Sequence, residues 1–196
     1  MASATWYTVW KVKYNLSFPD PDTVGVRYHT VVFVETNHPA QGDGTIHHVT
    51  GDLVSAGGMH YESKLGRNPV TSQTFHSKEF LGHVNASDYP HRFDQVCRAQ
   101  PAPPRQKAFN PVTGRHEPFK PDGTFYQPGE PRAPLFKCTE WTETRAIPAL
   151  FHHNLIQTGT QQAQAAQSQA SSSAQPEWDA SAGKWKYWNG HQYQWM

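Results

Sequence analysis

Cys138 is one of only two cysteines in this 196-residue chain, and its position could make it a nucleophile. It lies near the start of residues 135–153, LFKCTEWTETRAIPALFHH, which predict an amphipathic helix. A helix N-terminus carries partial positive charge and free N–H groups, which favour a thiolate over a thiol. Lys137 adds a positive charge next to it, and the amide of Cys138 could donate to a developing oxyanion. The position therefore predicts a reactive thiol.

The second cysteine, Cys97, has a different setting. It lies late in a predicted helix over residues 87–99, between Val96 and Arg98 and near the apolar Phe93. A cysteine in such surroundings usually packs as a small hydrophobic side chain. A disulfide between the two cysteines is a third possibility. The sequence starts without the basic and apolar profile of a signal peptide, so we expect a reducing, cytoplasmic location with free thiols.

A nucleophilic thiol needs a base, and histidine is the usual choice. Because the chain has twelve histidines, position must select among them. His29 opens the β-branched part of residues 26–36, and His47 and His48 lie in residues 45–54; both segments predict strands. A strand fixes the direction of its side chains, as a catalytic base requires. Taken singly, each of these histidines is more typical of an ordinary surface or core side chain.

Together these segments carry a family pattern. YHTVVFVET and GDGTIHHVTG, followed far downstream by KCTEW, resemble the circularly permuted papain-like superfamily, which includes NlpC-type peptidases and lecithin:retinol acyltransferase-like proteins. The resemblance implies that Cys138 is the nucleophile and His29 the base. It also implies that His47 is the second histidine, which orients the base, and that Trp141 is the aromatic residue three positions after the nucleophile.

The resemblance covers residues 24–54 and 136–155 and departs from the family at two places. Lys137 precedes the nucleophile, where the family has Asn. The connection over residues 37–44 is longer than the tight turn of the family. The limited coverage leaves the middle and the tail of the chain without a family counterpart.

The residue that orients the base has two candidates. The family pattern favours His47. If Thr36 pairs with Thr45, however, counting along antiparallel strands places Asp52 opposite His29. The orienting residue fixes the tautomer of the imidazole and stabilises the imidazolium. Asp52 is therefore the rival of His47.

The resemblance implies acyl transfer through a Cys–His dyad. The thiolate of Cys138 would attack a carbonyl group while His29 relays protons, and water or an amine would resolve the thioester. The partner would be a peptide, a protein or a small-molecule acyl substrate with an amide, isopeptide or ester bond, and no cofactor is implied. The alternative is a catalytically inactive papain-like domain that acts as a protein-interaction module. The sequence does not distinguish a hydrolase from a transferase.

Composition and spacing argue against several other functions. The chain has 17 Lys and Arg and 16 Asp and Glu without a basic block, so we expect no nucleic-acid partner. No apolar stretch approaches the ~20 residues of a membrane span, so we expect no membrane partner. His47 and His48, like His152 and His153, are adjacent, and neighbours on a strand point to opposite faces. No metal-binding motif such as Cys-x-x-Cys occurs, so we expect no metal site.

The pattern of elements predicts an α+β fold, with an antiparallel sheet packed on a few helices. Residues 1–156 form the predicted papain-like domain, and residues 100–134 within it form an irregular Pro/Gly-rich insertion that could cover a cleft. Pro148 predicts a kink, or two helices that meet near Ile147.

The end of the chain differs in composition from the rest. Residues 157–176 are rich in Gln, Ser and Ala and predict a flexible linker. Residues 177–196 are rich in Trp and Tyr and predict a β-hairpin that turns at Asn189-Gly190. This hairpin could dock onto the main domain or bind a partner.

Overall fold

The computed structural model describes residues 5–23, 25–159, 177–179, 184–188 and 193–195. The chain divides into two compact units, Met1–Ile156 and Gln157–Met196. The first unit is an α+β domain that contains both cysteines, and the strands described in the second unit form a small β-sheet. The predicted α+β class with an antiparallel sheet is confirmed for the first unit.

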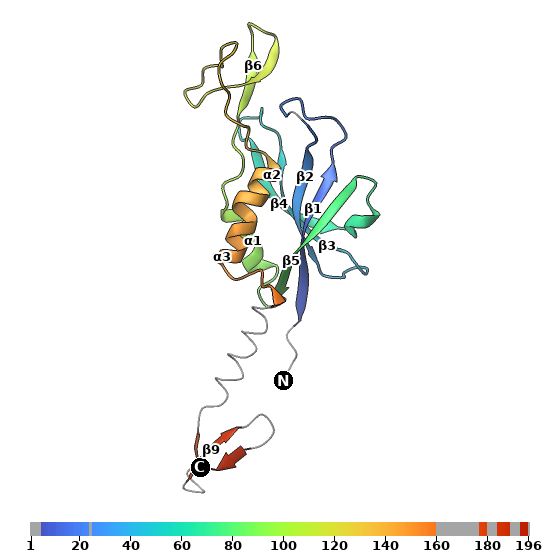
Figure 1. Ribbon diagram of the computed structural model, residues 1–196, viewed down its shortest axis with the longest axis vertical. Coiled ribbons are helices and arrows are strands. Elements are labelled where there is room, and N and C mark those ends of the chain that lie inside the picture. Colours follow the sequence, from blue (N-terminus) through green and yellow to red (C-terminus); the bar gives the residue numbers. More distant parts are fainter. Residues whose placement is uncertain (1–4, 24, 160–176, 180–183, 189–192, 196) are drawn as a thin grey trace. The chain divides into compact units, whose positions relative to one another are not determined.

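A five-stranded antiparallel sheet, in the order β4-β3-β2-β1-β5, forms the centre of the first unit (Figure 1). The strands are β1 (Trp6–Asn15), β2 (Tyr28–Glu35), β3 (Gly44–Gly51), β4 (Met59–Gly66) and β5 (Phe75–Asn85). The middle strand is β2, and residues 30–34 within it are completely buried. Its β-branched run suits a strand with both faces covered, so the prediction of a central strand is confirmed.

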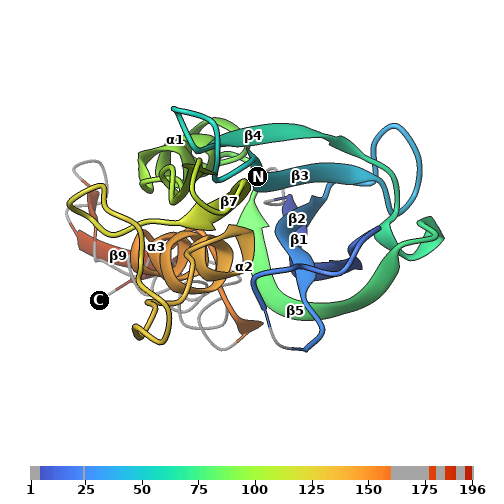
Figure 2. The same cartoon turned by 90° about the horizontal axis from the view of Figure 1, so that it is seen from above.

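Helical segments cover one face of this curved sheet (Figures 1 and 2). They are α1 (His91–Ala99), α2 (Cys138–Trp141), the π-helical segment η2 (Thr142–Ala146) and α3 (Ile147–His152). A separate short 3₁₀ helix, η1 (Pro69–Thr71), precedes β5. The helix after Cys138 changes from the π-helical to the α-helical segment at Ile147, where two helices were predicted to meet. The change lies here because Pro148 has no N–H to donate. Within the described residues no helix is long and apolar enough to cross a membrane.

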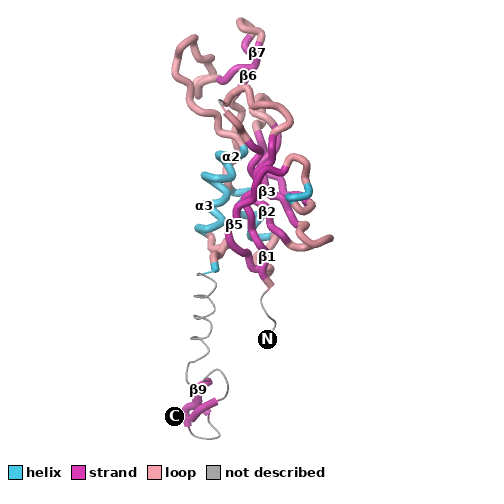
Figure 3. The backbone as a smooth tube through the Cα atoms, turned by 45° about the vertical axis from the view of Figure 1, so that its right-hand side comes forward, coloured by secondary structure: helices cyan, strands magenta, loops and turns pink. Residues whose placement is uncertain are grey.

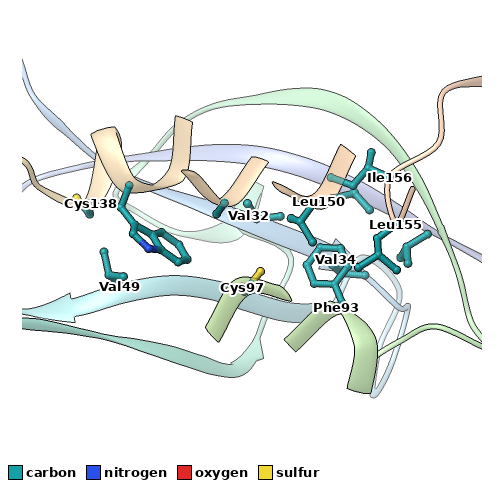
Figure 4. Close-up of a cluster of buried hydrophobic side chains, with 13 residues drawn as sticks. Val32, Val34, Val49, Phe93, Cys97, Cys138, Leu150, Leu155 and Ile156 are labelled. Atoms are coloured by element: carbon teal, nitrogen blue, oxygen red, sulfur yellow. The ribbon is translucent and has the colours of Figure 1, made fainter. Parts of the chain in front are cut away.

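Each face of the sheet carries its own apolar cluster. The cluster between the sheet and the helices is the larger one, and Figure 4 shows Cys97 in its middle and Cys138 at one end. Its completely buried members include Val32, Val34, Phe93, Trp141 and Leu150. Full burial of one such side chain stabilises a fold by about 1.5–3 kcal/mol, so this cluster fixes the helices on the sheet. The opposite face carries the second cluster, formed by Val12, Val31 and Phe33.

The Pro/Gly-rich insertion contains regular structure that the sequence did not predict. β6 (Lys107–Asn110) and β7 (Arg115–Pro118) form an antiparallel hairpin, seen beyond the end of the main sheet in Figure 3. Two hydrogen bonds join the ends of the insertion: the side chain of Gln106 donates to the carbonyl of Phe136 at 2.7 Å and accepts from its N–H at 2.8 Å. We call this pair the Gln106–Phe136 clasp.

The insertion is also attached to the sheet. The N–H groups of Gln106 and Lys107 both donate to the carbonyl of Leu53, and the N–H of Met59 donates to the carbonyl of Pro103 at 2.9 Å. Gly58 permits this close approach: its φ is 66°, and a Cβ at this position would lie 2.5 Å from the carbonyl oxygen of Pro103. Only glycine adopts such a conformation readily at a site without room for a side chain.

The described residues of the second unit include three short strands. They are β8 (Glu177–Asp179), β9 (Lys184–Trp188) and β10 (Tyr193–Trp195), which form an antiparallel sheet in the order β10-β9-β8. The predicted turn at Asn189-Gly190 lies outside the described residues, as does most of the predicted linker.

Candidate functional site

A cleft of about 380 Å³ lies where β2 begins and the helix of Cys138 starts. Cys138 and His29 both line it. The other walls include the loop between β1 and β2 and residues 51–54, at the end of β3 and just after it. The volume falls within the lower range of small-molecule sites. The two residues predicted as nucleophile and base therefore border the same space.

Cys138 is the first residue of α2, as its sequence context predicted. The carboxylate of Glu140 accepts a hydrogen bond from the backbone N–H of Lys137 at 2.8 Å, which satisfies one of the free donors at this helix end. The residue is 8% exposed, and its thiol donates to the carbonyl oxygen of Tyr28 across 4.0 Å. The thiol is thus held at a helix N-terminus and at the edge of the cleft.

Lys137, which replaces the Asn of the resembling family, forms an ion cluster with the loop before β2. Its ammonium lies 2.7 Å from Asp20 and 3.0 Å from Asp22. Arg27 pairs with Glu140 and lies 3.3 Å from Asp20. Burial raises the pKa of Asp20, but the hydrogen bonds from Lys137 and from the backbone of Asp22 outweigh burial and lower it overall. These pairs tie the loop to the start of the helix.

His29 is held by a chain of side chains that crosses three strands. Its Nε2 lies 2.9 Å from Nδ1 of His48, and Nε2 of His48 lies 2.9 Å from a carboxylate oxygen of Glu62. Glu62 can only accept, so Nε2 of His48 carries a proton and its Nδ1 accepts the proton of His29 Nε2. This tautomer leaves the lone pair on Nδ1 of His29, which is the atom that a base uses.

Burial sets the charge of this chain. It lowers the pKa of His29 to about 4, and the nearby charges of His48 and Lys64 act in the same direction. Burial also lowers the pKa of His48, although the hydrogen bond to Glu62 opposes this effect. Both imidazoles are therefore neutral near pH 7, and His29 can accept a proton.

His47 does not hold His29 as predicted; His48 occupies that place. Adjacent strand residues point to opposite faces, so only one of the two can meet His29. His47 is completely buried, with Nδ1 2.7 Å from the hydroxyl of Tyr61 and Nε2 3.0 Å from that of Tyr89. Tyr61 in turn donates to Asp94 at 2.6 Å. His47 belongs to a polar network that joins α1 to the sheet.

Asp52, the rival candidate, does not hold His29 either. One of its oxygens accepts from the N–H groups of Val54 and Ser55, and the other accepts from the hydroxyl of Ser55 at 2.8 Å. When the observed pairing of β2 and β3 is extended, Thr50 falls opposite His29. Asp52 closes a turn after β3.

The observed register differs by two residues from the one assumed in the sequence analysis. Val34, rather than Thr36, pairs with Thr45. The paired strands end earlier because the N–H groups of Thr36 and Asn37 both donate to the carbonyl of Asp43 and close the loop. A shift of two residues keeps the same face of the strand and changes which residue lies opposite.

Cys138 and His29 share the cleft without a direct bond. Across the described ranges of the chain, no hydrogen bond joins the thiol to the imidazole. By strand alternation His29 shares the face of Val31 and Phe33, whereas α2 packs on the other face. His29 is the second residue of β2, at the end of the sheet that borders the cleft. The structure therefore places Cys138 and His29 at the same cleft, with the thiol bonded to the carbonyl of Tyr28 and the imidazole to His48.

Two parts of the site were missed by the sequence analysis. The first is the pair His48 and Glu62. The alternation of side chains between the two faces of a strand is the sequence signal that could have placed them with His29. The second is the loop with Asp20 and Asp22, to which the sequence analysis assigned no role. Its pairing with Lys137 joins residues 117 positions apart and has no local signal in the sequence. Over residues 5–23 and 25–159, no group of three or more His, Cys, Asp or Glu side chains is placed to hold a metal ion.

The chain belongs to a protein family described as a family of unknown function (DUF6540), which matches residues 16–157. No curated protein and no solved structure matches the chain. The matched region contains every residue that lines the cleft, from Leu16 to Cys138. The cleft is therefore part of the family's domain, whereas β8 to β10 lie outside the match.

Proposed function

We propose that this protein is a cysteine-dependent acyl-transfer enzyme with a permuted papain-like domain. Cys138 is the nucleophile, His29 is the base, and His48 is the positioning residue. The observation that carries the proposal is that a thiol at a helix start and an imidazole with a fixed tautomer border one cleft. Glu62 supports the tautomer through His48.

The first half of the reaction forms a thioester. Nδ1 of His29 takes the proton of the Cys138 thiol, and the sulfur attacks the carbonyl carbon of an amide or ester. The backbone N–H of Cys138, in the first helical turn, donates to the oxyanion. The bond to the leaving group then breaks, and the leaving nitrogen or oxygen takes the proton from the imidazolium of His29.

The second half restores the thiol. His29 removes a proton from water or from an acceptor amine, which attacks the thioester carbonyl, and the carbon–sulfur bond breaks. The sulfur takes back the proton that His29 holds. While the imidazolium exists, the negative charge of the thiolate favours it and raises the pKa of His29. The low pKa of His29 thus describes the resting site and not the reacting one.

Site-resolved alkylation tests the proposal. Iodoacetamide at neutral pH, with mass spectrometry of each cysteine peptide, gives separate rate constants for Cys138 and Cys97. We expect Cys138 to react at least about tenfold faster than Cys97, because thiolate character and access control the rate. We expect His29→Ala to slow Cys138 by about tenfold or more, and the exposed-residue control His60→Ala to leave it unchanged.

Circular dichroism must show that each variant is folded. Slow alkylation of Cys138 in the folded wild type, or a rate unaffected by His29→Ala, would overturn the proposal. That result would favour a second candidate, an inactive papain-like domain that binds other proteins. The observation behind this candidate is the thiol of Cys138, which donates to the carbonyl of Tyr28 and not to His29.

A further inference from the structure

The charged side chains of the cleft already have partners within the protein. Asp20 and Asp22 pair with Lys137, and Arg27 pairs with Glu140. The remaining charges show the same behaviour. Lys107 lies 2.8 Å from Asp22, and the oxygens of Asp52 accept hydrogen bonds from its own turn. A charged substrate would have to compete with these pairs, so the lining favours an uncharged ligand.

Most of the uncharged lining is apolar. Leu16, Phe18 and Pro19 come from the loop before β2, while Leu53 and Met59 come from the opposite wall. Phe18 is 82% exposed and Leu16 is 40% exposed. An aromatic side chain this exposed beside a reactive group leaves apolar area that a ligand could cover, and removal of that area from water favours binding.

The ion cluster holds this apolar wall in position. The side chain of Asp20 is 6% exposed and meets both Lys137 and Arg27. Asp20 lies two residues after Phe18, so the loop that carries Phe18 is anchored to the residue before Cys138. Because this loop is already ordered before a ligand binds, less of the binding free energy is lost in ordering it.

We infer that the cleft accepts acyl donors with an uncharged, apolar group next to the carbonyl, and that Phe18 is a specificity-determining residue that contacts this group. The inference rests on the proposed function and names the class of its substrate. The occupant is the apolar group of a small substrate or of a peptide side chain. The paired charges and the position of Phe18, two residues before the Asp20 that pairs with Lys137, support this choice.

Two alkylating reagents that differ in one group test the inference. Iodoacetamide and N-benzyl iodoacetamide carry the same reactive centre, and the ratio of their rate constants at Cys138 measures the preference for an apolar group. We expect the wild type to favour the benzyl reagent by about tenfold, the usual size of discrimination by a hydrophobic pocket. Phe18→Ala should abolish most of this preference. Phe109→Ala, which removes another exposed phenylalanine outside the cleft, should leave it unchanged.

The ratio of the two rate constants tests this inference, whereas the absolute rate at Cys138 tests the proposed function. Slow alkylation by both reagents that does not depend on His29 would refute the proposed function, but the ratio would still report on the wall. An equal ratio in the wild type and Phe18→Ala would overturn the inference. A dimer of the wild type that becomes monomeric in Phe18→Ala would also overturn it, since a second copy would then cover Phe18. Light scattering of both proteins measures this.

Discussion

Acidification should destabilise the domain through His29. Burial lowers its pKa from 6.5 to about 4 in the folded state, so the unfolded chain binds the proton more readily. The contribution of this group is therefore fully present above pH 6.5 and is lost as the pH falls towards 4. With one pKa unit worth about 1.4 kcal/mol, His29 should cost about 2 kcal/mol of stability between pH 7.5 and pH 5.

Urea unfolding of the wild type and of His29→Gln at both pH values measures this effect. Glutamine does not titrate, and His47 and His48 are present in both proteins, so the difference reports the titration of His29 together with its coupling to His48. The free energy of unfolding of the wild type should fall by about 2 kcal/mol more than that of the variant. His60→Gln, a control at an exposed position, should behave as the wild type.

An equal acid-induced loss in the wild type and His29→Gln would refute the reasoning. It would mean that His29 titrates in the folded protein as it does in the unfolded chain. The lowered pKa of His29 in the folded protein would then be wrong. A larger loss in His60→Gln than in the wild type would show that the substitutions act through general destabilisation.

Two further predictions concern the supports of the site. Asp94→Ala removes the carboxylate that accepts from Tyr61 and lies 3.2 Å from the completely buried His47, so it should lower the free energy of unfolding by about 1–3 kcal/mol in urea. Asp88→Ala breaks an ion pair with the exposed Arg92 and should change it by less than about 0.5 kcal/mol; equal effects would contradict the argument from the burial of the partners. Gly58→Ala should detach the insertion and speed its cleavage by trypsin, because the new Cβ meets the carbonyl of Pro103. Gly57→Ala, which has no neighbour within 4 Å, should be cleaved as the wild type.

The sequence predicted the central elements of the fold because their signals are local. The β-branched run of β2 needs burial on both faces, and Pro148 changes the helix wherever it lies. The start of α1 was predicted less accurately. The predicted helix began at Ser87, but residues 86–90 form turns and the helix starts at His91. The hairpin of β6 and β7 was missed because proline and glycine dominate its surroundings.

The site was predicted only in part, for a physical reason. The helix start at Cys138 and the strand start at His29 are local features, and both border the cleft. The choice between His47 and His48 depends on which face of the sheet each side chain occupies. The choice of Asp52 depended on the register of β2 and β3, which the loop between these strands sets. The pairing of Lys137 with Asp20 joins residues 117 positions apart and has no local signal.

The Gln106–Phe136 clasp has a consequence for how this domain can vary. The two ends of the excursion over residues 107–135 meet at a neck that is closed by hydrogen bonds within the domain. A segment of another length, or with another sequence, could be exchanged between these two residues while the sheet and Cys138 keep their places. The clasp is therefore a suitable junction for grafting. It separates the excursion over residues 107–135 from the sheet and helices of the domain.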